Sequence, residues 1–205
     1  MKQKLLEVLR CPKSGQSLQL ETNPVRRGAD FGIQHEIMNG WLISVDRVYR
    51  YPVRDGIPRF VPPSNYADSF GMQWKKFGKT QLDSFSGLPI SANRFWKATG
   101  WVPDEMRGRW VLDAGCGSGR FAEVALGAGA YVVALDYSEA VDACYFNLGH
   151  HPNLHIVQGD IYNLPFVPEF FSFVYCLGVL QHTPDVPKAF AALPKMLTRG
   201  GEALR

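Results

Sequence analysis

Three alternating glycines follow an apolar run that ends in an acid, in the segment from Arg109 to Phe121. The run predicts a strand, and the glycines predict a tight turn before a helix, a geometry that lets the backbone approach a ligand closely. A dinucleotide-binding fingerprint needs a glycine at the position of Arg120, where it allows the helix to pack closely on the strand. Arg120 therefore argues against NAD and favours a different nucleotide-like ligand.

Acidic residues end three successive strand candidates. Asp113 precedes the glycines, Asp136 ends the run from Tyr131 about 20 residues after them, and Asp160 ends the run from Leu154. Ligands of open parallel sheets bind outside the carboxyl ends of the strands, so these carboxylates are expected to converge on one rim. The spacing predicts Asp136 as a ribose ligand. The alternative for each acid taken alone is a cap of the next helix or turn.

A fourth strand candidate, residues 170–176, completes a series of four motifs in compatible order, Leu112–Gly119, Ala134–Ser138, Gly159–Phe166 and Gly178–Thr183. The chain from about residue 109 onwards resembles class I S-adenosylmethionine-dependent methyltransferases of the type 11 group. The resemblance implies an α/β fold, with a doubly wound, Rossmann-like, mostly parallel sheet, and S-adenosylmethionine as the cofactor.

The resemblance also implies roles for individual residues. Asp136 would bind the ribose diol, and Asp160 with the Ile161 backbone would recognise adenine. Asp113 would orient the turn and the amino end of the cofactor, which the Leu177 carbonyl would face. The glycines that would pack against the methionine part are Gly115, Gly117 and Gly119.

Methyl transfer needs mainly alignment of acceptor, methyl group and sulfur, and a general base only for a hydroxyl or a protonated amine. His182, just after the fourth strand, is a candidate for that base because histidine titrates near neutral pH. The alternative is a histidine that hydrogen-bonds the adjoining loop.

Turn-forming and linker residues along the chain, together with shifts in composition, predict three parts, residues 1–62, 63–108 and 109–205. The first part is expected to be a small α+β domain with a helix at 5–9 and strands at 41–45 and 48–53. It resembles the zinc-ribbon-like domain of small methyltransferase-activating proteins. Ser14 replaces the second cysteine of its C-P-x-C knuckle, so we expect no metal site and interpret residues 1–62 as a packing or partner-docking unit.

The middle part is rich in aromatic residues, and Phe70, Trp74 and Phe77 recur at helical spacing. Such a stripe is typical of a core, but a helical cover over the cofactor site, with Gln73 or Arg94 reaching the ligand, is the functional alternative.

The last part ends soon after a helix expected over 184–197 and a strand expected to begin near Glu202. The related fold continues beyond this point, so the resemblance implies a methyltransferase domain that is incomplete at its C-terminus.

Composition narrows the class of protein. The formal charge of +3 is spread along the 205 residues, which gives no indication of nucleic-acid binding. No apolar run approaches the roughly 18 residues of a membrane span, and no signal peptide is recognisable, so we expect a cytoplasmic protein.

Three functions remain open from the sequence. The favoured one is a methyltransferase that acts on a small-molecule acceptor, with a possible protein partner at the N-terminal part. The others are a non-catalytic S-adenosylmethionine-binding or adaptor protein and, less favoured because of Arg120, an NAD-dependent oxidoreductase.

Overall fold

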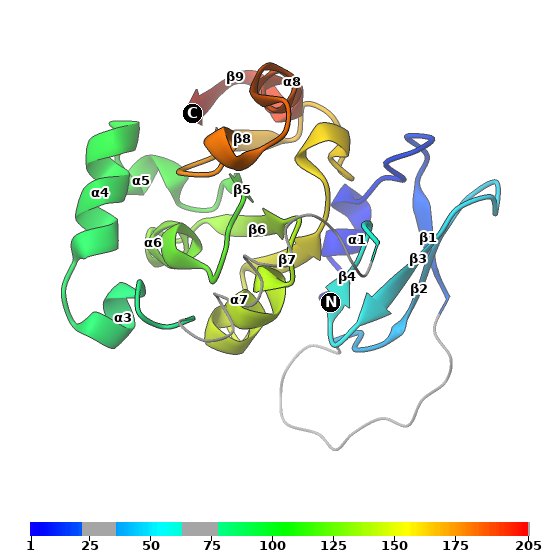
Figure 1. The fold of residues 1–205 in the computed structure, drawn as a ribbon, viewed down its shortest axis with the longest axis horizontal. Helices are drawn as coiled ribbons and strands as arrows, with labels where there is room; N and C mark the ends of the chain where they lie inside the picture. The colour runs from blue at the N-terminus through cyan, green and yellow to red at the C-terminus, as the bar shows by residue number, and fades with distance from the viewer. Residues whose placement is uncertain (22–35, 63–77, 205) are drawn as a thin grey trace.

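The computed structural model describes residues 1–21, 36–62 and 78–204, and its centre is a five-stranded sheet. The strands follow the order β7-β6-β5-β8-β9, and every neighbouring pair is parallel (Figure 1). This confirms the predicted doubly wound α/β fold. The strands are β5 (Trp110–Ala114), β6 (Tyr131–Asp136), β7 (Leu154–Gln158), β8 (Phe171–Tyr175) and β9 (Leu197–Leu204).

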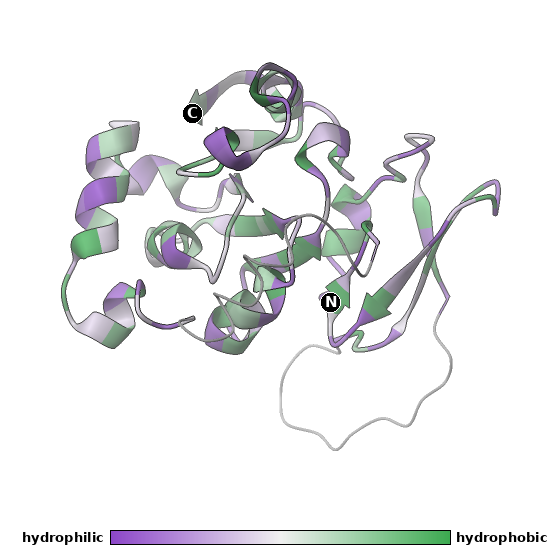
Figure 2. Ribbon diagram, in the orientation of Figure 1, coloured by the Kyte–Doolittle hydropathy of each residue, from purple (hydrophilic) through white to green (hydrophobic). Residues whose placement is uncertain are grey.

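The central strands are apolar along nearly their whole length, as expected of parallel strands covered on both faces. All five residues of β7 are buried, and so are the last four of β5. Figure 2 shows hydrophobic residues along these strands and mixed colouring on the helices around them.

Strand order reverses between β5 and β8. The chain runs outward from β5 through β6 to β7, and then returns to add β8 and β9 on the other side of β5. A crevice forms where strand order reverses, at the carboxyl ends of the strands. The topology thus predicts the binding site beside the turn after β5.

One face of the sheet is covered by α6 (Arg120–Gly127) and α7 (Ala140–Leu148). Helix α4 (Ile90–Thr99) packs on α6 and brings Phe95 into the same core. The other face is covered by α8 (Val186–Ala192) and by α1 (Leu5–Val8) of the N-terminal part. The remaining short helices are α3 (Asp83–Ser86), α5 (Pro103–Met106), η1 (Ile161–Asn163), η2 (Leu180–His182) and η3 (Pro194–Met196).

Residues 1–21 and 36–62, called the N-terminal unit below, contain α1 and an antiparallel sheet of order β1-β2-β3-β4. The helix and the two strands expected here are present, within one or two residues of the predicted bounds. The division of the chain at residues 62 and 108 stays a prediction. The strands are β1 (Leu18–Glu21), β2 (Gly40–Ser44), β3 (Arg50–Arg54) and β4 (Ile57–Pro58).

The N-terminal unit lies against the β7 edge of the parallel sheet (Figure 1). Arg59 makes a parallel bridge with Gln158, and Leu9 makes an antiparallel bridge with Phe166. The connection from β7 to β8 holds only the short turn η1, and α1 packs on the sheet face beside it, with Leu5 and Leu9 fully buried. The N-terminal unit therefore completes the core on that face.

The end of the described chain differs from the predicted bounds. Helix α8 stops at Ala192 because Pro194 has no N–H to continue the helical hydrogen bonds, and the strand begins at Leu197 rather than near Glu202. The helix predicted around Phe70–Phe77 lies outside the described residues. None of the described helices is both long and apolar enough to cross a membrane.

A buried histidine is the second residue of strand β7. The His155 ring stacks on Trp110 with 5.3 Å between centroids, and neither ring nitrogen has a hydrogen-bond partner within the described ranges. Burial, helped by the charges of Lys2 and Lys4, lowers the pKa of His155 from 6.5 to about 3. The ring is therefore neutral in the folded protein at neutral pH.

His155→Phe is expected to flatten the dependence of stability on acid pH. The unfolded chain binds a proton on His155 below pH 6.5, whereas the folded chain resists protonation down to about pH 3, so stability falls as the pH falls through this window. Urea unfolding from pH 7 to pH 4 should give a wild-type-minus-variant difference that changes by up to about 1.4 kcal/mol per pH unit. Parallel curves for the two proteins would contradict this assignment.

Candidate cofactor site

A cavity of about 500 Å³ opens at the carboxyl ends of the parallel strands, beside the point where strand order reverses. Its volume lies in the range of small-molecule and cofactor sites. Segments after β5, β6, β7 and β8 all contribute to the wall. The predicted site residues that line it are Gly115, Gly117, Asp136, Asp160, Ile161, Leu177 and His182.

The turn after β5 depends on its glycines. Gly115 has a φ of +93°, and a Cβ atom placed on it would lie 2.5 Å from the Val179 side chain, which also lines the cavity. Gly119, with a φ of +99°, does not line the cavity. A Cβ there would lie 2.7 Å from Leu148 of α7. Gly115 thus allows close approach at the cavity wall, and Gly119 allows the turn to pack on α7.

Asp136, at the end of β6, joins the two neighbouring loops. One carboxylate oxygen accepts from the Gly117 N–H at 2.9 Å, and the other accepts from the Ser138 N–H at 2.9 Å and its hydroxyl at 2.7 Å. Burial raises the pKa of the Asp136 carboxyl, while these donors oppose the rise. An ionised carboxylate has about four acceptor positions, so room remains for a hydroxyl in the cavity.

Asp160 and Ile161 form the wall after β7. One oxygen of Asp160 accepts from the Tyr162 N–H at 2.9 Å, which fixes the start of η1, and Ile161 is buried beside it. The cavity here combines a carboxylate with an apolar surface, a combination suited to a planar base that carries an amino group.

Asp113 does not share the rim with the other two carboxylates. It is only 2% exposed, does not line the cavity, and pairs in register with Tyr175 of β8. Burial raises the pKa of Asp113 to about 8, and the charge of Asp136 adds to the rise. Its carboxylate is enclosed beside Tyr175 of β8, so Asp136 and Asp160 line the cavity without it, and the expected role of Asp113 towards the cofactor stays a prediction.

Arg94, which the helical-cover alternative named as a ligand contact, lines the cavity on its α4 side together with Arg120. Arg120 at the start of α6 donates from Nε to the Ser91 hydroxyl at 2.9 Å and from Nη1 to the Gln81 amide oxygen at 3.3 Å. Arg94 of α4 also lines the cavity, and burial together with the Arg94 charge lowers the pKa of Arg120. Gln73, the alternative ligand contact, lies outside the described residues.

His182 also lines the cavity, in the turn η2 after β8, and its side chain is exposed. Its Nε2 is 3.4 Å from the Gln181 side-chain amide, and its backbone N–H donates to the Val179 carbonyl. Thr183 completes this wall. His182 therefore lies where a methyl acceptor in the cavity could contact it, and its role as a general base stays a prediction.

The cysteines were expected not to form a metal site. Among the residues that the structure describes, no group of three or more metal-ligating side chains comes together. At the incomplete knuckle, the Cys11 sulfur lies 3.2 Å from the Tyr51 hydroxyl and accepts from the Ser14 N–H. Tyrosine and backbone contacts thus surround this sulfur.

The known proteins that this chain resembles in sequence and in structure are methyltransferases. Residues 112–204 match the family profile described as a methyltransferase domain. A structure described as that of an S-adenosyl-L-methionine-dependent methyltransferase from Methanococcus maripaludis matches with a TM-score of 0.55 and 20% identity, over 70% of this chain and 64% of that one. At this identity the structural match supports the fold alone.

Two curated relatives match part of the chain. A ubiquinone biosynthesis O-methyltransferase of Aromatoleum aromaticum is 28% identical over 60% of this chain and 59% of its own length. A 2-phytyl-1,4-naphtoquinone methyltransferase of Thermosynechococcus vestitus is 30% identical over 57% of this chain and 54% of its own. The chain thus spans little more than half the length of these relatives.

Residues 112–204 therefore match a methyltransferase domain in sequence, and the chain shares the fold of a structure described as an S-adenosyl-L-methionine-dependent methyltransferase. The cofactor of this class is S-adenosylmethionine, and the cavity fits it. Asp136 offers an acceptor for a ribose hydroxyl, Gly115 leaves room that a side chain would fill, and Asp160 with Ile161 offers a polar and apolar wall for adenine.

Gly115→Ala is expected to destabilise the fold and to abolish cofactor binding. A positive φ alone costs a non-glycine residue about 1–2 kcal/mol, and the overlap with Val179 adds about 1–3 kcal/mol. Gly100→Ala is the matched control, because Gly100 also has a positive φ of +69° but a Cβ there meets nothing within 4 Å.

Urea unfolding and calorimetric titration with S-adenosylhomocysteine would measure both effects. Gly100→Ala should lose only the roughly 1–2 kcal/mol that a positive φ costs a non-glycine residue, and should keep the wild-type affinity for S-adenosylhomocysteine. Equal losses of stability in the two variants would show that the Val179 contact does not constrain the turn.

Proposed function

We propose that this chain is an S-adenosylmethionine-dependent methyltransferase that acts on a small-molecule acceptor. The observation that carries the proposal is the cavity at the reversal of strand order, lined together by the glycine turn, Asp136, and the Asp160–Ile161 segment. The two curated relatives described above are named for ubiquinone biosynthesis and for a naphtoquinone, which supports a small molecule as acceptor. The comparisons give no support to the adaptor and oxidoreductase alternatives.

The chain's own residues bind and orient the cofactor in this proposal. Asp136 holds the ribose, Asp160 and the Ile161 backbone hold adenine, and the glycine turn lies along the methionine part, with the Leu177 carbonyl facing its amino group. Asp113, below the turn, keeps the strand end in place through the packing around Tyr175. Arg94 and Arg120 provide positive charge for a carboxylate at the α4 side.

S-adenosylmethionine supplies a methyl group activated by a positively charged sulfur when it is bound. The protein then has to hold an acceptor in line, and holding reactants in place can contribute about 7–11 kcal/mol to lowering the barrier. His182 is the proposed base for an acceptor hydroxyl, because it lines the cavity and its exposed ring can pass a proton to solvent.

The N-terminal unit is proposed to dock a partner protein rather than to bind the cofactor. The resemblance to an activating domain, and the expectation that a second protein docks on it, stay predictions.

Calorimetric titrations with S-adenosylmethionine, S-adenosylhomocysteine and NAD test the proposed cofactor. We expect both sulfur compounds to bind and NAD not to bind, because Arg120 holds the position of the third glycine of a dinucleotide site. Transfer of a labelled methyl group into an extract of small metabolites tests the activity. Failure of both sulfur compounds to bind would end the proposal, and binding without transfer to any metabolite would favour the adaptor.

His182→Ala is expected to lower turnover at saturating cofactor by about 100-fold in the labelled-methyl assay, because proton removal by a placed base contributes about that much or more. Gln181→Ala is the control, since Gln181 is also exposed and lines the same wall. Unchanged turnover in the His182 variant would remove the base from the mechanism.

A further inference from the structure

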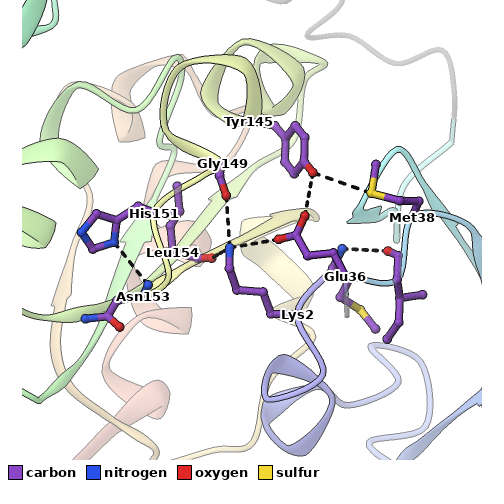
Figure 3. Close-up of polar contacts among 10 residues, drawn as sticks. Lys2, Glu36, Met38, Tyr145, Gly149, His151, Asn153 and Leu154 are labelled. Carbon is purple, nitrogen blue, oxygen red and sulfur yellow. Dashed lines mark hydrogen bonds and ion pairs between the residues drawn. The ribbon is translucent and has the colours of Figure 1, made fainter. Parts of the chain in front are cut away.

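The N-terminal unit is fixed to α7 and the start of β7 by buried and half-buried polar contacts (Figure 3). The Lys2 ammonium donates to the carbonyls of Gly149 at 3.2 Å and Leu154 at 2.9 Å, and pairs with Glu36 at 3.1 Å. The Tyr145 hydroxyl donates to the Glu36 carboxylate at 2.9 Å. These contacts join the N-terminal unit to α7 and β7, and the joined region is called the platform below.

Arg59, just after β4, reaches from this platform into the sheet edge. Its side chain is only 6% exposed and donates to Asp142 of α7 at 2.7 Å and to the Gln158 amide oxygen at 2.9 Å. The backbone beside Arg59 also pairs with Gln158, because the N–H of Phe60 donates to the Gln158 carbonyl at 2.8 Å. Arg59 and Gln158 are 99 residues apart in the sequence, so this contact is purely tertiary.

The contact fixes the orientation of the Gln158 amide. A guanidinium can only donate, so the Gln158 oxygen must face Arg59 and its NH₂ group must face the other way. That NH₂ group donates to the Tyr137 carbonyl at 3.2 Å. Gln158 is 2% exposed, so neither group can exchange its partner for bulk water.

Tyr137 links Gln158 to the cavity. It follows Asp136 directly and lines the cavity, while the Asp136 carbonyl accepts from the Gly159 N–H at 2.9 Å. Gln158 is also the register partner of Asp136 across β6 and β7. The Arg59 side chain is thus two hydrogen bonds from the backbone that aims the proposed ribose ligand.

We propose that Arg59 is a positioning residue of the cofactor site, through which the N-terminal unit sets the backbone after Asp136 by way of Gln158 and Tyr137. This rests on the proposed function. The N-terminal unit raises the affinity for the cofactor without touching it. A loss of the contact lets the Gln158 amide turn and the loop of Tyr137 shift, while the rest of the platform remains docked.

Three substitutions separate this role from a merely structural one. Arg59→Met keeps the length of the stem and removes all donors. Gln158→Glu keeps an acceptor for Arg59 but loses the donor to the Tyr137 carbonyl. Asp142→Asn is the matched control, since it weakens the ion pair with Arg59 and leaves the path through Gln158 intact. Calorimetry with S-adenosylhomocysteine and urea unfolding are measured on each full chain.

Arg59→Met and Gln158→Glu are expected to bind S-adenosylhomocysteine about three- to thirtyfold more weakly, in the range of coupling between connected sites. Asp142→Asn should lose stability but keep the wild-type affinity. If Arg59→Met fails to fold, Gln158→Glu alone carries the test.

Wild-type affinity in Gln158→Glu would overturn the positioning role, and so would affinity losses in all three variants that simply follow their losses of stability. A wild-type chain that binds no S-adenosylhomocysteine would instead refute the proposed function on which the inference rests.

Discussion

The hydrogen bond from the Gly117 N–H to the Asp136 carboxylate joins the two loops on which the cavity depends. It forms because β5 and β6 are parallel neighbours, in register from Trp110 with Tyr131 to Ala114 with Leu135, so that both strands end at the same level. The glycine turn can then curl over the end of β6. The bond ties the shape of the turn to the position of the acid.

The same register continues outward to the N-terminal unit. β7 pairs with β6 up to Gln158 opposite Asp136, and Gln158 in turn meets Arg59 beyond the edge of the parallel sheet. An exposed edge strand leaves backbone groups unpaired, and here the N-terminal unit covers part of that edge. Sheet, cavity and N-terminal unit therefore form one connected arrangement.

The strands and most of the cavity wall could be predicted from the sequence because their signals are local. Apolar runs that end in an acid place Asp136 and Asp160 at strand ends, and topology brings strand ends together. The side-chain direction of Asp113 depends on packing against Tyr175, which no local pattern encodes. Gly119 likewise serves α7 packing rather than the cavity wall.

The contacts of Arg59 could not be predicted, since they join segments far apart in the chain. The one local signal is a charged residue between Ile57-Pro58 and Phe60, in a segment that is otherwise apolar. In the same way, the cover that α1 provides on the sheet follows from the short β7–β8 connection only once the sheet order is known.

The measurement that tests the central claim most directly is amide hydrogen exchange of the full chain with and without S-adenosylhomocysteine. The account predicts added protection in three segments that are separate in the sequence and all line this cavity, residues 115–118, 136–138 and 159–161. Protection confined to another surface, or none at these three segments at a concentration that saturates binding, would contradict it.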